Sequence, residues 1–205
     1  MPVVLLIRHG ENEYVKKGRM AGRLPGVHLN ETGLKQAQVL AEKLSAAPIK
    51  AIYSSPLERA IETARPLAEA LGLPIQIRPS LIETDIGEWQ GHTLKCVRRL
   101  KLWRVVQSTP SLMRFPGGES FADAQYRMSL EIQSICSSHE KDNLIACFSH
   151  ADPIKLAIAY FVGIPLDNFQ RLFVAPGSIT TLVIGENSSH LMNLNIDYSL
   201  NLEKH

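Results

Sequence analysis

The stretch VVLLIRHGENEY, from Val3 to Tyr14, decides how the rest of the chain is interpreted. It begins with five apolar residues, all valine, leucine or isoleucine, which is typical of a buried strand with both faces covered, as in a parallel sheet. Arg8, His9 and Gly10 follow at once. Because open α/β sheets bind ligands beyond the carboxyl ends of their strands, this position makes His9 a candidate nucleophile.

The composition is that of an ordinary globular protein. The 205 residues are 45% hydrophobic and 20% charged, with a net charge of +2. Such a small excess argues against nucleic-acid binding, which needs a clustered basic surface, and no apolar run approaches the roughly 18 residues of a membrane span. Three cysteines without CxxC spacing fit a reducing compartment, and the first residues lack the pattern of a secretory signal. These features predict a cytoplasmic protein with no nucleic-acid or membrane partner.

Strand-like and helix-like patterns alternate along the chain. The helical patterns run over Glu31–Leu44, Ser55–Leu71, Leu94–Val106, from Ser120 to between Ser134 and Ser138, and from Asp152 to just before Gly163. The strand patterns are Val3–Ile7, Lys50–Tyr53, Pro74–Arg78, Leu144–Phe148, and the two arms of a hairpin, Thr180–Ile184 and His190–Asn195. This order predicts an α/β fold: a three-layer α/β/α sandwich with a mostly parallel central sheet and a C-terminal antiparallel hairpin.

Three helices are expected to begin at capping residues, one of them at Ser120 with Asp123. Ser55 is the predicted N-cap of the second helix, with Pro56 at its first position and Glu58 completing a capping box. Asp152 and Pro153 are expected to cap and open the helix that follows the strand at Leu144–Phe148.

The whole chain, residues 1–205, is expected to form a single domain. The one candidate subdomain is an insertion from Leu81 to Gly118, rich in acids, glycines and basic residues. It is too short to hold a core of its own. We therefore expect it to form a lid over the substrate.

Polar side chains follow three of the predicted strands. The first strand leads into Arg8 and His9, the strand at Leu144–Phe148 leads into His150, and the second leads into a helix whose first turn carries Arg59. If these strands are parallel, all four side chains meet at one edge of the sheet. Two arginine forks, two imidazoles and a helix N-terminus together favour a dianion such as a phosphoryl group.

His9 beside such cations can attack phosphorus as a neutral imidazole and form a phosphohistidine. The leaving group then needs a proton, and Glu83, in the acidic loop after the third strand, is the best-placed acid. Burial beside a bound phosphate should raise the pKa of Glu83 and keep it protonated near neutrality. The remaining histidines show no metal-ligand spacing. The prediction is catalysis without a metal or cofactor.

Four motifs resemble a known family. RHGE at Arg8–Glu11, SSPLERAIETA at Ser54–Ala64, ETDIGEWQG at Glu83–Gly91 and SHADP at Ser149–Pro153 occur in the order found in the histidine phosphatase superfamily, in its phosphoglycerate-mutase-like branch. The resemblance implies that His9 is the nucleophile and Glu83 the proton donor. It also implies that Arg8, Arg59 and His150 bind phosphate, the roles that the residues themselves suggest.

The chain departs from the family pattern at three places. Val15 stands where an asparagine usually touches phosphate, so Asn12 is the predicted replacement ligand. Ala21 replaces a hydroxyl residue. Asp152 replaces a glycine and, as an acid near phosphate, is expected to cap the next helix instead.

Three functions remain open. The first is a phosphatase of small phosphomonoesters, the second a phosphoglycerate mutase that uses the same phosphohistidine, and the third a non-catalytic module that binds phosphorylated ligands. Mutases of the family are usually longer, with a C-terminal tail that shields the intermediate, so the ending SLNLEKH favours hydrolysis. The expected partner is a small phosphorylated molecule. Monomer and homodimer both remain open.

Overall fold

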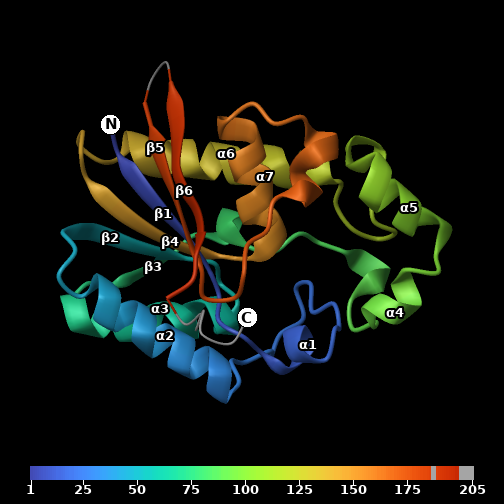
Figure 1. Ribbon diagram of the computed structural model, residues 1–205, viewed down its shortest axis with the longest axis horizontal. Coiled ribbons are helices and arrows are strands. Elements are labelled where there is room, and N and C mark those ends of the chain that lie inside the picture. Colours follow the sequence, from blue (N-terminus) through green and yellow to red (C-terminus); the bar gives the residue numbers. More distant parts are fainter. Residues whose placement is uncertain (186–187, 199–205) are drawn as a thin grey trace.

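The central feature of the computed structural model is a sheet built around β1. The structure describes residues 1–185 and 188–198, and within these ranges six strands pair in the order β3-β2-β4-β1-β5-β6 (Figure 1). Their bounds are β1 (Val3–Arg8), β2 (Ile49–Ser54), β3 (Ile75–Ile77), β4 (Leu144–Ser149), β5 (Ile179–Ile184) and β6 (Ser189–Ile196). The first four strands of that order are parallel, whereas β5 runs antiparallel to β1 and β6 antiparallel to β5.

Helices cover both faces of this sheet, so the predicted three-layer α/β class is confirmed. One face carries α2 (Glu31–Leu44) and α3 (Glu58–Leu71), and the other carries α6 (Phe121–Ser137) and α7 (Ala151–Phe161) (Figure 1). No helix of the described part is long and apolar enough to cross a bilayer. The hairpin turn residues Glu186 and Asn187, and the ending SLNLEKH, lie outside the described residues.

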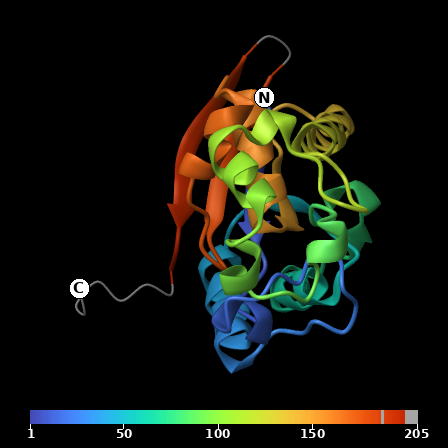
Figure 2. The same ribbon diagram turned by 90° about the vertical axis from the view of Figure 1, so that its right-hand side faces the viewer.

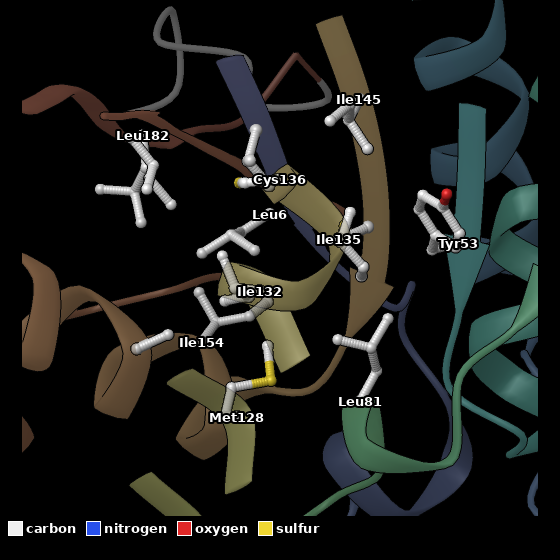
Figure 3. Close-up of a cluster of buried hydrophobic side chains, with 14 of the residues drawn as sticks. Leu6, Tyr53, Leu81, Met128, Ile132, Ile135, Cys136, Ile145, Ile154 and Leu182 are labelled. Carbon is white, nitrogen blue, oxygen red and sulfur yellow. The ribbon is translucent and has the colours of Figure 1, made fainter. Parts of the chain in front are cut away.

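Strand alternation places β1 in both hydrophobic cores. Leu5 and Ile7 pack toward α2 and α3, whereas Val4 and Leu6 pack toward α6 and α7. Figure 3 shows the second of these cores, in which Leu6 lies beside side chains of α6 such as Ile132. Because both faces are buried, the register of β1 is tightly specified: a slip by one residue would turn every side chain to the opposite face.

The register of β1 against β4 aligns the strand ends that carry the candidate site. Arg8 lies opposite Ser149, and the His9 backbone N–H donates to the Ser149 carbonyl oxygen at 3.0 Å. His9 and His150 therefore leave the sheet side by side.

The predicted cap at Ser120 and Asp123 is confirmed as a capping box at the start of α6, whereas the predicted caps at Ser55 and Asp152 are wrong. α3 begins at Glu58, and its N-cap, Leu57, makes no side-chain cap bond. Ser55 stays in the extended segment after β2, because its N–H donates to the carbonyl oxygen of Phe148 at 2.9 Å. Asp152 lies inside the first turn of α7 and pairs with Lys155 at 2.7 Å. The residue at the N-cap of α7 is instead His150.

The predicted helix Leu94–Val106 is two helices, α4 (Leu94–Val97) and α5 (Lys101–Ser108). Val97 and Val106 are both buried in the same cluster. In one straight helix these residues would be about two and a half turns apart and would face opposite sides. The break lets both reach one core. The segment between β1 and α2, for which no helix was predicted, also contains a short helix, α1 (Glu13–Lys16).

The insertion shares its core with α6, α7 and a 3-10 segment, Leu166–Arg171. Aromatic rings run in contact from the insertion into the main body, in the order Trp103, Trp89, Phe115, Phe121 and Phe169. The insertion helices α4 and α5 lie at one side of the molecule, the side that faces the viewer in Figure 2. Side-chain packing against α6 and α7 therefore anchors this segment.

Replacing Trp89 with alanine should show how much this packing contributes to the stability of the protein. The side chain is 3% exposed and contacts rings on both sides, so we expect the free energy of unfolding to fall by about 3–5 kcal/mol. Urea unfolding followed by circular dichroism measures this change. Leu112→Ala is the control, because Leu112 is 78% exposed and its truncation should cost less than about 0.5 kcal/mol. Equal effects of the two substitutions would contradict the packing argument.

Candidate active site

The carboxyl ends of three neighbouring parallel strands deliver the predicted residues to one place. β1 leads to His9, β4 to His150, and β2 to the start of α3, which carries Arg59. The imidazole rings of His9 and His150 have centroids 5.1 Å apart and meet edge to face at 61°. The predicted convergence at this edge of the sheet is thus visible in the ring geometry.

His9 is held as a neutral imidazole with a free Nε2. Its Nδ1 lies 2.7 Å from the carbonyl oxygen of Gly10. A carbonyl only accepts, so Nδ1 carries the hydrogen and Nε2 keeps its lone pair. Burial, followed by the positive charges of Arg59 and Arg8, holds the pKa of His9 well below its ordinary value. An unprotonated nitrogen therefore persists near neutral pH, as nucleophilic attack requires.

The backbone after His9 is fixed by α3 and α2. The Gly10 N–H donates to Thr63 Oγ1 at 3.0 Å, and Thr63 Oγ1 donates to the carbonyl oxygen of Arg59 at 2.7 Å. A Cβ on Gly10 would lie only 2.7 Å from the carbonyl oxygen of Gly33. The glycine permits this close approach, which locks the turn next to the nucleophile.

Both arginines carry buried N–H groups that point to no protein acceptor. Arg59 is 1% exposed and donates from Nη2 to the carbonyl oxygen of Gly22 at 2.7 Å, while its Nε and Nη1 have no partner in the described structure. Arg8 donates from Nη1 to the carbonyl oxygen of Val174 at 2.7 Å and leaves Nε without one. Unsatisfied donors on buried cations are costly, and a bound anion would satisfy them.

In His150 the hydrogen-bonded ring nitrogen is Nε2, whereas in His9 it is Nδ1. Its Nε2 lies 2.8 Å from Ser55 Oγ, and this oxygen accepts the N–H of Leu57 at 3.3 Å. In the tautomer in which the Ser55 hydroxyl donates to Nε2, the imidazole hydrogen lies on Nδ1, a buried atom without a partner in the described structure. Burial, then Arg59, holds the pKa of His150 well below its usual value. His150 is therefore a neutral imidazole beside the neutral imidazole of His9.

Ser55 is the contact that the sequence interpretation missed. The hydroxyl had been assigned to the helix cap, although it follows β2 just as His150 follows the adjacent strand β4. That shared position at neighbouring strand ends is the signal that could have revealed the contact.

Asn12 is buried and serves as the N-cap of α1. Its Oδ1 accepts the N–H of Val15 at 2.9 Å, and its buried Nδ2 has no partner among the residues described. Val15, which stands at the position of the family's usual asparagine, thus orients the amide of Asn12 through its backbone. The remaining amide hydrogens are free for a ligand.

The Glu83 carboxyl has a raised pKa, so it remains partly protonated near neutral pH. Burial, and next the negative charge of Asp152, raises the pKa of Glu83 to about 7, against the opposing influence of Arg59 and Arg8. Its Oε1 accepts the N–H of Thr84 at 2.8 Å. Asp152, predicted only as a cap, therefore acts on Glu83 through charge.

Four of these residues carry buried nitrogen donors that no protein group satisfies. In the described structure the unpartnered nitrogens of these four residues are Arg8 Nε, Asn12 Nδ2, Arg59 Nε, Arg59 Nη1 and His150 Nδ1, and Arg127 Nε is a further buried nitrogen without a partner. Across residues 1–185 and 188–198, no group of three or more His, Cys, Asp or Glu side chains is arranged to hold a metal ion. Convergent donors, a free imidazole nitrogen and a protonated carboxyl are the parts that phosphoryl transfer to nitrogen requires.

The chain is similar to several known phosphatases. Phosphoserine phosphatase 1 of Hydrogenobacter thermophilus is 31% identical over 198 residues, covering 96% of this chain and 93% of that protein. The structure of phosphoserine phosphatase from Entamoeba histolytica in complex with phosphoserine superimposes with a TM-score of 0.89 at 25% identity, covering 98% of this chain and 100% of the other. Mycobacterial glucosyl-3-phosphoglycerate phosphatase in complex with VO3 gives 0.86 at 28% identity, with 94% and 98% covered.

The family model for the histidine phosphatase superfamily (branch 1) matches residues 4–197, nearly the whole chain. The match contains both strand ends that carry the imidazoles and both arginines. This chain belongs to the histidine phosphatase superfamily.

Proposed function

We propose that this protein is a phosphatase that hydrolyses small phosphomonoesters through a phosphohistidine on His9. The observation that carries the proposal is the set of unpartnered buried nitrogen donors around the free Nε2 of His9. Arg8, Arg59, His150 and Asn12 are the proposed phosphate ligands. Their N–H groups would bind the non-bridging oxygens and stabilise the charge that develops in the transition state.

In the first step, the lone pair of His9 Nε2 attacks phosphorus and the bond from phosphorus to the ester oxygen breaks. The departing oxygen takes the proton of Glu83, so an alcohol leaves and a phosphohistidine remains. The Arg8 and Arg59 guanidiniums stay paired with phosphate oxygens throughout.

In the second step, the Glu83 carboxylate removes a proton from water as that water attacks phosphorus. The bond between phosphorus and His9 Nε2 breaks, and inorganic phosphate leaves. Glu83 is protonated again and His9 is neutral again, so the cycle closes without a metal.

The substrate class is a small phosphorylated metabolite. The relatives named above act on phosphoserine and on glucosyl-3-phosphoglycerate, both phosphomonoesters. We assign the choice of substrate to the insertion at residues 81–118, which we propose acts as a lid within one domain spanning residues 1–205. No nucleic acid or membrane takes part in this proposal.

The proposed location is the cytoplasm. All three cysteines are free, and Cys136 and Cys147 are buried. Burial raises the pKa of the Cys136 thiol to about 11 and raises that of Cys147 further. Buried thiols of this kind are packing residues that suit a reducing compartment.

A panel of phosphomonoesters, assayed for released phosphate with EDTA present, tests the proposal. The panel includes phosphoserine, 3-phosphoglycerate and phosphorylated alcohols without other charges. We expect release that EDTA does not lower and that is absent from His9→Ala protein purified in parallel, which controls for contaminating phosphatases.

Two other outcomes would replace the proposal. Transfer of phosphate between the carbons of phosphoglycerate, stimulated by the bisphosphate, would identify a mutase. Binding of phosphorylated ligands without turnover would identify a non-catalytic module.

A further inference from the structure

One carboxylate oxygen gathers three donors from three parts of the chain. Glu119 Oε1 accepts from Arg23 Nη2 at 3.0 Å, from Arg127 Nη2 at 2.8 Å and from the N–H of Asp85 at 2.9 Å. The Glu119 side chain is 16% exposed, so the ion pairs are largely shielded from water. Charge-assisted bonds in such surroundings are strong and directional.

The two arginines of this network hold the backbone on both sides of Glu83. Arg23 Nε donates to the carbonyl oxygen of Glu83 at 2.8 Å. Arg127 Nη1 donates to the carbonyl oxygens of Ile82 at 3.0 Å and Ser80 at 2.5 Å. The backbone that runs from the 3-10 turn Pro79–Leu81 to Glu83 is thereby held at three carbonyl groups.

The segment that contains Glu119 is also seated directly on the Glu83 loop. The Glu119 N–H donates to the carbonyl oxygen of Asp85 at 3.0 Å, and the Glu88 N–H donates to that of Pro116 at 2.9 Å. A Cβ on Gly118 would collide with the carbonyl oxygen of Asp85. Gly118, the second glycine of FPGGES, is therefore required by this contact.

The same network also lies next to Arg59, one of the proposed phosphate ligands. The Gly22 carbonyl oxygen accepts from Arg59 Nη2 at 2.7 Å, and the next residue, Arg23, binds the backbone of Glu83. Two consecutive residues thus connect the guanidinium of Arg59, a proposed phosphate ligand, with the loop that carries Glu83. These two bonds therefore limit how far the Glu83 backbone can move from the Arg59 guanidinium.

We propose that Arg23 and Glu119 are positioning residues that aim the Glu83 carboxyl at the leaving-group oxygen. This inference rests on the proposed function. An acid misplaced by about 1 Å loses much of its effect, although it still lies in the site. The defect would appear only where the leaving group needs a proton.

Two esters with different leaving groups distinguish this role from general support of the fold. An alkyl phosphate needs a proton on its departing oxygen, whereas the anion of 2,4-dinitrophenol leaves without one. The measured quantity is kcat/KM, because it reports the steps up to departure of the leaving group and excludes hydrolysis of the phosphoenzyme. For Arg23→Lys and Glu119→Gln we expect about 10–100-fold loss with the alkyl ester and less than about threefold with the dinitrophenyl ester.

Three controls complete the experiment. Glu83→Gln should show the same selectivity with a larger loss. Arg114→Lys alters an arginine of the neighbouring segment whose ion pair, with Asp123 at 2.6 Å, is exposed, and it should change neither ester by more than about twofold. The inhibition constant of inorganic phosphate should stay within about threefold in both network variants, because the phosphate ligands are intact.

Several results would overturn the inference. Equal losses with both esters, or loss of inhibition by phosphate, would show that the network supports the structure of the whole site and does not specifically position Glu83. Unchanged kcat/KM in both network variants would show that the network does not contribute to catalysis. If Glu83→Gln showed no selectivity, Glu83 would not be the donor that the network aims. A wild-type protein that cleaved neither ester would overturn the proposed function itself, whereas selective loss in Glu83→Gln alone would leave that function standing and overturn only this inference.

Discussion

His9→Asn should lower kcat/KM for every phosphomonoester by roughly 10⁴-fold or more, because the nucleophile is removed while the arginines remain. Asparagine is close to histidine in size and polar, so the pocket should still bind inorganic phosphate. The loss should therefore appear in turnover, measured by steady-state kinetics, and not in the inhibition constant of phosphate.

The same variant should fail to form a phosphoenzyme. Rapid quenching of the wild type with ³²P-labelled substrate should trap an adduct that is labile in acid and stable in alkali, as a phosphohistidine is. His190→Asn is the matched control, since His190 is exposed on the edge strand β6, and it should retain activity within about twofold. An adduct that survives acid, or labelling of His9→Asn, would refute the assignment of the nucleophile.

Glu83 should set the alkaline limit of the reaction. Its pKa is raised to about 7, so the carboxyl carries its proton below this pH and loses it above. Since kcat/KM reports groups of the free enzyme, this constant should fall as pH rises through about 7 for substrates with poor leaving groups. Glu83→Gln should lower it by about 10²–10⁴-fold below pH 7 and abolish the dependence.

Asp152→Asn provides the sharper version of this test. The negative charge of Asp152 is the second cause of the raised pKa of Glu83, after burial. Removing it should lower the pKa of Glu83 and move the alkaline limb to lower pH, as profiles of kcat/KM would show. Glu88→Gln changes an exposed carboxylate of the same loop and should leave the limb in place. A limb that Asp152→Asn does not move would contradict the electrostatic origin of the shift.

The sequence was sufficient to predict the strand ends because their signals are local. A buried apolar run that stops at Arg8 and His9, and a second that stops at Ser149 and His150, needs no knowledge of distant contacts. Parallel pairing then brings these ends together. The α/β layers followed for the same reason, from the periodicity of each segment.

The missed features depend on partners that are remote in the sequence. Ser55 was interpreted as a cap because its neighbours fit one, yet its backbone is bound by β4 and its hydroxyl by His150. The Glu119 network joins segments whose spacing in the chain carries no signal. The break between α4 and α5 is set by a core that the insertion shares with α6 and α7.

The pairing of β1 with β4 has a consequence for synthesis of the protein. The two imidazoles belong to strands far apart in the chain, and β1 has its parallel neighbour only after β4 has been made. In a nascent chain, His9 therefore leaves the ribosome before the residues that complete the site, and it remains solvent-exposed until the segment carrying His150 emerges. Affinity for phosphate should arise abruptly at that length, so binding of phosphate by stalled chains of increasing length would report when the sheet closes.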